Sequence, residues 1–172
     1  MTEAGVRIAL HVTARITFVF FLCAFTGNAL RDLWPGRFSL RLSRNRDWFL
    51  IAMAAAHTFH LAAIIAFFQV VGWSKFHPVT LLGGGFVYLL IYALAAIAIM
   101  RLRRGSHGAL GGSPRLEATA LYLIWLIFAL SFFPRIVSGW PVYSLLAVAA
   151  LAGLVIRIAC LLRHKRALAT AA

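Results

Sequence analysis

Five runs of mostly apolar residues, each roughly 18–24 residues long, constrain the fold of this chain more than any other feature. At a helical rise of about 1.5 Å per residue, each run is long enough to cross a hydrocarbon core about 30 Å thick. The runs cover residues 8–30, 48–71, 79–100, 116–133 and 142–162. They predict one all-α domain over residues 1–172, a polytopic membrane helix bundle of about five transmembrane helices.

The composition agrees with a chain that folds in a bilayer. Of the 172 residues, 63% are hydrophobic and 12% are charged, and the charged residues cluster between the apolar runs. A soluble domain of this size would lack the polar residues to cover its surface. The first run is too long, and too polar at its start, for a cleavable signal peptide. Pro134 follows the fourth run, and a proline there is expected to end the helix.

The formal net charge of +13 would suggest a nucleic-acid partner in a soluble protein. Here the basic residues flank the apolar runs, where anionic lipid headgroups are the nearer partner, so we expect no nucleic-acid binding. The two cysteines, Cys23 and Cys160, lie inside apolar runs and form no CxxC motif. They therefore predict neither a disulfide framework nor a redox motif.

Basic residues are distributed unequally between the two sides that five crossings define. Thirteen of the 17 Lys and Arg residues fall on the side of the carboxyl terminus and four on the other. The four are Arg7, Arg15, Lys75 and Arg135. The positive-inside rule then predicts that the amino terminus is outside and the carboxyl terminus is cytoplasmic.

The one sizeable polar segment between the runs extends from Arg31 to Asp47 and mixes Leu, Phe and Trp with five arginines. Its arginines are Arg31, Arg37, Arg41, Arg44 and Arg46. Such a segment is typical of a chain that lies on anionic headgroups. Docking of an acidic partner protein is the alternative that the sequence leaves open.

Ionisable residues inside the first two runs predict a polar cluster within the membrane. His57 and His60 are three residues apart and share a helical face, and His11 and Arg15, four apart, also share one. If the two helices pack side by side, Arg15 lies close to the level of His60, roughly 12 Å below the outer surface. Thr13, Thr17 and Thr58 place hydroxyl groups nearby.

This cluster has two interpretations. Neutral imidazole is the usual axial ligand of b-type haem, and an intramembrane arginine can neutralise a propionate or another anion. Alternatively, the same side chains hydrogen-bond one another and backbone carbonyls and hold two helices together. The sequence contains no nucleotide-binding loop, Ser-His-Asp set or HExxH motif. With only four carboxylates in the chain, we predict no catalytic residue.

Four short patterns, taken in order, resemble the ferric reductase-like transmembrane family, in particular the haem-binding membrane subunits of bacterial methionine sulfoxide reductase systems. The patterns are Thr13-Ala14-Arg15 opening a span, Arg44-Asn45-Arg46 about 14 residues before His60, His77-Pro78 before a span that contains Gly83, and Arg103-Arg104 with Leu110-Gly111 before Leu121-Tyr122. Family members typically have one more helix at the amino terminus. Without that helix, five spans remain with the amino terminus outside.

The resemblance implies a multi-pass protein of the bacterial inner membrane that carries electrons through a b-type haem. The chain has no flavin or nicotinamide domain, so a separate redox partner protein is implied as donor or acceptor. The haem site expected from the resemblance and the cluster together has His60 as an axial ligand to the iron, His57 or His11 as its partner, and Arg15 on a propionate.

The sequence departs from the family at a later helix, which in the family supplies two histidines about 13 residues apart. The matching positions here are Ala118 and Ser131, or one residue earlier Glu117 and Leu130. A second axial ligand must therefore come from elsewhere or be absent. The missing histidines favour an alternative function, a non-enzymatic membrane subunit of the same fold that acts in structure, assembly or interaction. A small transporter would need paired broken helices, and we find no such repeat.

Overall fold

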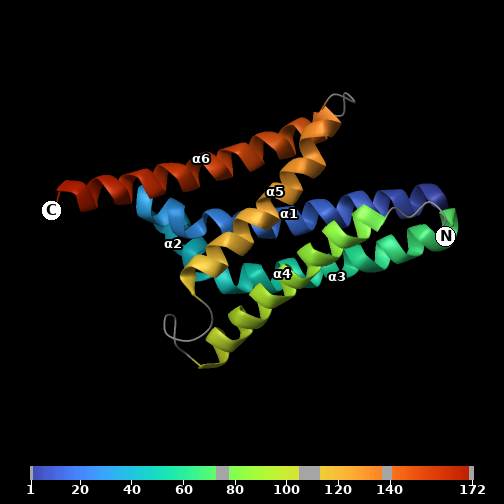
Figure 1. Ribbon diagram of the computed structural model, residues 1–172, viewed down its shortest axis with the longest axis horizontal. Coiled ribbons are helices and arrows are strands. Elements are labelled where there is room, and N and C mark those ends of the chain that lie inside the picture. The colour runs from blue at the N-terminus through green and yellow to red at the C-terminus, as the bar shows by residue number, and fades with distance from the viewer. Residues whose placement is uncertain (1, 73–77, 105–112, 137–140, 171–172) are drawn as a thin grey trace. The chain divides into compact units, whose positions relative to one another are not determined.

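The computed structural model of the chain describes residues 2–72, 78–104, 113–136 and 141–170. These residues form six helices and no strand, as Figure 1 shows. The helices are α1 (Glu3–Leu33), α2 (Arg37–Arg44), α3 (Arg46–Val71), α4 (Pro78–Arg104), α5 (Pro114–Ile136) and α6 (Pro141–Thr170). The predicted all-α fold is confirmed.

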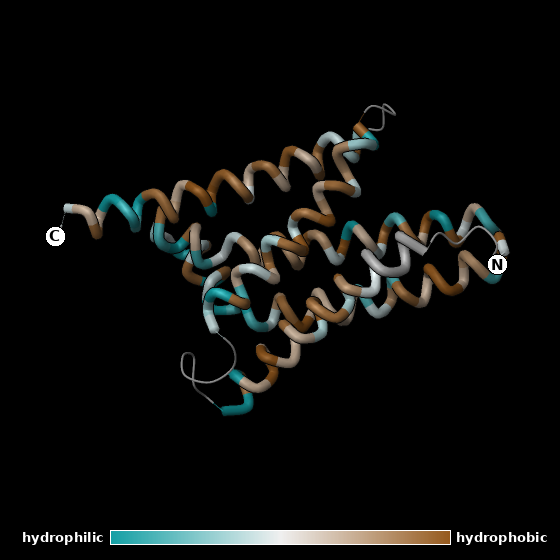
Figure 2. Tube along the Cα trace, viewed as in Figure 1, coloured by the Kyte–Doolittle hydropathy of each residue, from teal (hydrophilic) through white to brown (hydrophobic). Residues whose placement is uncertain are grey.

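Five of the helices are long and apolar enough to cross a membrane: α1, α3, α5, α6 and the Gly84–Arg104 part of α4. The prediction of a multi-pass membrane protein is thus confirmed. In Figure 2 apolar residues dominate these five helices, and hydrophilic residues gather in α2 and in the last turns of α4 and α6. An odd number of crossings would put the two ends of the chain on opposite sides of the membrane. Which end faces the cytoplasm stays a prediction.

The prediction that Pro134 ends the fourth span is wrong, because α5 continues through it to Ile136. Proline lacks an N–H group, and its ring disturbs the carbonyl four residues earlier. Only two residues of α5 follow Pro134, so little of the helix is disturbed. The guanidinium of Arg135 donates a hydrogen bond to the Ser131 carbonyl in this last turn.

The described contacts fall into two compact units. The first comprises Met1–Phe21 and Asp47–Ala120, which are the first part of α1, most of α3, all of α4 and the start of α5. Thr13 contacts His60, and the Arg7 guanidinium lies 5.0 Å from the centre of the Phe67 ring. An earlier residue of α1 therefore meets a later residue of α3, so the two helices run antiparallel.

A charged network joins α3, α4 and α5 in this unit. Nη1 of Arg101 lies 3.3 Å from the Asp47 carboxylate, and the Arg101 guanidinium also pairs with Glu117. Because His57 on α3 contacts Tyr88 while Asp47 meets Arg101, α3 and α4 also run antiparallel. Glu117 is among the buried side chains. A carboxylate can be buried because a partner of opposite charge and hydrogen bonds compensate it.

The second unit comprises Leu22–Arg46 and Leu121–Ala172. In it α1 and α6 run parallel. Arg157 and Arg163 of α6 donate hydrogen bonds to the carbonyls of Phe25 and Asp32, which lie 132 and 131 positions earlier in the chain. Because the difference in residue number between contacting residues stays nearly constant along both helices, the two helices run in the same direction.

Small residues on α6 allow this close packing. The buried residues of the helix recur at steps of three, four or seven, which keeps them on one face. They are Tyr143, Ala147, Ala150, Gly153 and Cys160. A Cβ atom added at Gly153 would lie 2.8 Å from Cδ1 of Leu22 on α1. The indole N–H of Trp125 on α5 donates to the Ala150 carbonyl at 2.9 Å, so α5 covers the same stretch of α6.

The short helix α2 packs on α1 through one face. Ser39 and Leu42 are buried, and the carbonyl oxygen of Leu42 would lie only 3.2 Å from a Cβ added at Gly27. The Ser39 hydroxyl accepts a hydrogen bond from the Gly36 N–H and donates one to the Trp34 carbonyl, which fixes the turn from α1 into α2.

Candidate functional site

The predicted pair of histidines lies at the centre of a polar cluster in the first unit. His57 and His60 share one face of α3, and their rings are stacked with centres 5.5 Å apart and planes inclined by 26°. His57 is buried and His60 is half-buried. The shared face that the spacing predicts is confirmed. The side chains around it come from α1 and α4.

Thr13 of α1 fixes the protonation of the His60 ring. Its hydroxyl oxygen lies 2.7 Å from the Ala9 carbonyl and 2.9 Å from Nδ1 of His60. A carbonyl can only accept, so the Thr13 proton is directed to Ala9 and the hydroxyl oxygen accepts from Nδ1–H of His60. In a neutral ring this leaves Nε2 of His60 as the nitrogen with a free lone pair.

Tyrosines of α4 cover the other side of the cluster. The Tyr88 ring lies 4.1 Å from the His57 ring, and its hydroxyl donates to the His57 backbone carbonyl at 3.4 Å. Tyr92, one turn further, shares a hydrogen bond of 2.9 Å with Thr58. Nδ1 of His57 is buried and has no hydrogen-bond partner among the described residues. His57 is thus held by ring contacts, whereas His60 is held by a hydrogen bond.

Two further predicted site residues lie elsewhere on α1. His11 and Arg15 flank Thr13 two positions to either side, about 200° around a helix of 3.6 residues per turn. Thr13 faces His60, so His11 and Arg15 occupy the opposite side of α1. His11 is exposed and Arg15 is half-buried. Their predicted roles at a haem stay predictions.

The arrangement fits a haem iron from one histidine only. Two axial ligands of one iron approach it from opposite faces of the macrocycle, so their nitrogens point towards each other. The rings of His57 and His60 instead stack on one face of one helix, which does not allow both to bind the same iron in that way. In the described ranges, no group of three or more His, Cys, Asp or Glu side chains is arranged to hold a metal ion.

The sequence reasoning missed the tyrosines and the arginine network. Tyr88 and Tyr92 lie four residues apart in an apolar run, so their polar groups share a face, and this spacing could have been recognised. The pairing of Arg101 with Glu117 joins residues from two helices, and spacing alone does not reveal it. Two parts of the resemblance, His77 and Leu110-Gly111, lie outside the described residues.

The five arginines predicted to meet headgroups divide into two groups. Two are engaged within the second unit: Arg31 pairs with Asp32 at 2.8 Å, and Nε of Arg46 donates to the Ala24 carbonyl at 3.3 Å. The other three are exposed on α2 at spacings of four and three, which places them on the face opposite Ser39 and Leu42. They are Arg37, Arg41 and Arg44. We call them the α2 arginine face.

Comparison with known proteins adds no relative. No protein-family model, curated protein or solved structure matches this chain.

Proposed function

We propose that this chain is a multi-pass protein of a bacterial inner membrane, of ferric reductase-like type, that passes electrons through a b-type haem to or from a separate redox partner. The observation that carries the proposal is the hydrogen bond between Nδ1 of His60 and the Thr13 hydroxyl. Histidines that bind a metal commonly donate their other ring N–H to an oxygen, which fixes the tautomer and makes the ligating nitrogen more basic. A bound haem would supply the one-electron chemistry.

His60 is the proposed axial ligand, through Nε2. Because the stacked His57 ring does not reach the opposite face of the same haem, and His11 lies on the side of α1 away from His60, we propose ligation from one side only. The role of Arg15 is to contact a propionate. Tyr88 and the hydroxyl of Thr13 hold the two imidazoles in place and leave His60 one orientation.

An absorption spectrum of the protein purified after expression with sufficient haem tests the proposal. We expect a Soret band that shifts on reduction with dithionite and is lost in His60→Ala. His164→Ala, which changes a histidine outside the cluster, should leave the band unchanged. If the spectrum of the unmodified protein has no Soret band, the haem proposal is wrong.

A non-enzymatic membrane subunit is the second candidate. It is favoured by the internal pairing of the polar groups, since Thr13 bonds His60, Tyr92 bonds Thr58, and Arg101 holds two carboxylates. Interhelical hydrogen bonds of this kind hold helices together without any ligand. Comparing the unmodified protein with His60→Ala distinguishes the haem protein from the non-enzymatic subunit. Under the second, His60→Ala lowers the thermal stability of a colourless protein, and no spectral change accompanies the loss.

The α2 arginine face is proposed to bind anionic headgroups, because basic residues on a surface helix gain about 1 kcal/mol each from an anionic leaflet. Replacing Arg37, Arg41 and Arg44 together by Gln should weaken the binding of a soluble peptide of Trp34–Asn45 to phosphatidylglycerol vesicles at low salt. A scrambled peptide of equal charge is the control. If the native and the scrambled peptide bind the vesicles equally, the binding depends on net charge alone and not on the arginine face. An acidic partner protein would then be the better explanation for that face.

A further inference from the structure

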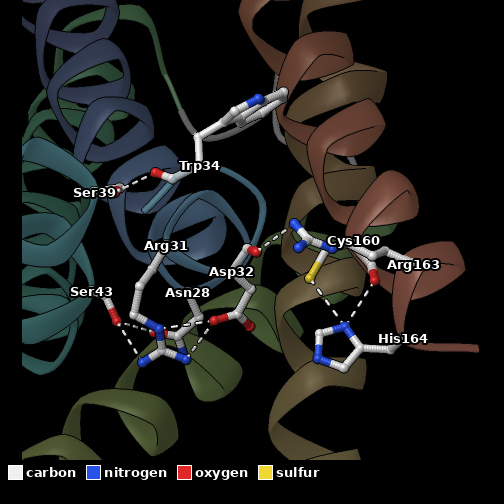
Figure 3. Close-up of polar contacts among 9 residues, drawn as sticks. All are labelled: Asn28, Arg31, Asp32, Trp34, Ser39, Ser43, Cys160, Arg163 and His164. Carbon is white, nitrogen blue, oxygen red and sulfur yellow. Dashed lines mark hydrogen bonds and ion pairs between the residues drawn. The ribbon is translucent and has the colours of Figure 1, made fainter. Parts of the chain in front are cut away.

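We propose that the cleft lined by Asp32, Arg163, His164 and Ala167 binds the phosphate of an anionic phospholipid headgroup. The cleft belongs to the second unit and has a volume of about 310 Å³. Figure 3 shows its polar side chains, which come from the end of α1 and from the last turns of α6. It shares no residue with the polar cluster of the first unit or with the α2 arginine face.

The cleft exists because α6 continues after its packing ends. The buried face of α6 reaches as far as Cys160, and all residues from 161 to 170 are exposed. His164 and Ala167 follow Cys160 at steps of four and three, so they continue the face that packed on α1. Beyond Leu33, the last residue of α1, this face lines the cleft.

The one acidic group in the cleft is neutralised. Nη2 of Arg31 lies 2.8 Å from the Asp32 carboxylate, and Nη1 of Arg31 donates to the Ser43 hydroxyl at 3.2 Å. Ser43 donates in turn to the Asn28 side chain at 2.8 Å. These contacts hold the carboxylate within α1 and α2, and the remaining charge on the wall is the positive charge of Arg163.

Arg163 still offers donors to a ligand, and His164 offers an acceptor. Nη1 of Arg163 donates to the carbonyls of Asp32 and Leu33, and in the described part of the chain all of its hydrogen bonds come from this nitrogen. Nδ1 of His164 lies 2.9 Å from the Cys160 carbonyl, so it carries a proton that this carbonyl accepts, and in a neutral ring Nε2 can accept a hydrogen bond from a hydroxyl group of the headgroup. A planar guanidinium with three further N–H groups, on Nε and Nη2, suits the oxygens of a phosphate.

Apolar surface beside the cleft favours a lipid as the source of the phosphate. Leu161 and Leu162 are 53% and 50% exposed and precede Arg163 on a helix that is apolar enough to cross a membrane. Acyl chains can cover these leucines while the headgroup meets Arg163.

Native mass spectrometry of the full chain in detergent, titrated with phosphatidylglycerol, tests the proposal. We expect one tightly retained lipid, and a loss of affinity of about tenfold in Arg163→Gln, since a charge-assisted pair is removed. His164→Ala should weaken binding severalfold. Lys165→Gln removes the same unit of charge outside the cleft and should change the affinity less than twofold. Inorganic phosphate at the same concentration should not displace the lipid.

Two results would overturn the proposal. Equal losses in Arg163→Gln and Lys165→Gln would mean diffuse attraction to basic residues, and displacement by inorganic phosphate would mean a site for the free ion. Arg163 also binds carbonyls at the end of α1, so its loss can disturb folding. His164 bonds only within its own helix in the described structure, so His164→Ala decides the matter if Arg163→Gln does not fold.

Discussion

The guanidinium of Arg101 binds the carboxylate of Glu117 through both of its terminal nitrogens, and this pair connects α4 to the first turn of α5. The side chain of Glu117 is 8% exposed and that of Arg101 is 17% exposed, so both are largely removed from solvent. Each protects the other from an uncompensated buried charge.

Removing one partner of this pair should therefore be costly. We expect Glu117→Ala and Arg101→Ala each to lower the free energy of unfolding by about 3–5 kcal/mol. The double variant should lose less than the sum of the two, because neither charge is then left alone. Arg103→Ala, an exposed arginine of the same turn, is the control. Thermal unfolding in detergent measures all four, and additive losses would contradict the pairing.

The hydrogen bond between the Thr13 hydroxyl and the His60 ring should contribute to stability and, if haem binds, to haem affinity. Thr13→Val keeps the shape and removes the hydrogen bond, so we expect a loss of about 0.6–1 kcal/mol in stability. If haem binds as proposed, the same change should lower haem affinity about tenfold or more, as loss of a partner to a ligating histidine does. Thr13→Ser retains the hydroxyl and should behave like the unmodified protein in a haem titration. Equal behaviour of Val and Ser would refute the role of the hydroxyl.

A methyl group at Gly27 should displace α2. The nearest atoms to the added Cβ are the backbone oxygen and carbon of Leu42 at 3.2 and 3.3 Å, and backbone cannot rotate away as a side chain can. We expect Gly27→Ala to cost about 1–3 kcal/mol, as overpacking does, and to speed hydrogen exchange in α2. At Gly84 an added Cβ meets nothing within 4 Å. Gly84→Ala should therefore be neutral or stabilising, since alanine favours a helix.

Arg157 should not tolerate lysine. Its guanidinium lies 5.0 Å from the centre of the Phe25 ring and 5.1 Å from that of Tyr122, so it contacts both rings at once. The compact ammonium of lysine cannot stack on two rings and also reach the Phe25 carbonyl. We expect Arg157→Lys to lower stability by about 1–2 kcal/mol. Arg166→Lys, an exposed position of the same helix, should have no effect in the same unfolding experiment.

The bias of basic residues predicts the orientation, and labelling of single cysteines tests it. In a protein with Cys23 and Cys160 replaced by alanine, Glu3→Cys should react with a membrane-impermeant maleimide on intact cells. Thr170→Cys should react only after lysis. The reverse pattern would place the carboxyl terminus outside, against the positive-inside rule.

The sequence predicted the spans well because the cost of burying backbone and charged groups in hydrocarbon depends on local composition. It predicted the ends less well. Helices continue into the interface, where water again satisfies polar groups, so α6 extends to Thr170 although its apolar run ends near residue 162. Pro134 is tolerated for a related reason, since only Arg135 and Ile136 follow it in α5.

The site was predicted in part. Spacing placed His57 and His60 on one face, and it placed Thr13 near them. Depth along the helix also put Arg15 at the level of His60. Depth does not give the angular position of a side chain around the helix axis, however, and it is Thr13, not Arg15, that lies on the side of α1 that faces α3. The spacing of Tyr88 and Tyr92 could have indicated a polar face on α4, but not that this face meets α3, because lipid-facing and helix-facing apolar residues look alike in sequence.

The division of the chain into two units has a consequence for the order in which the protein is made. The first unit is complete once Ala120 has been synthesised, whereas the second needs Leu121–Ala172 as well as Leu22–Arg46. Ala172 follows Arg46 by 126 residues, so at about 5–20 residues per second the end of α1 and all of α2 wait roughly 6–25 s before α6 is complete. During that interval the part of α1 that later packs against Gly153 and Arg157 of α6 is uncovered. A membrane chaperone or insertase can bind to it in that time.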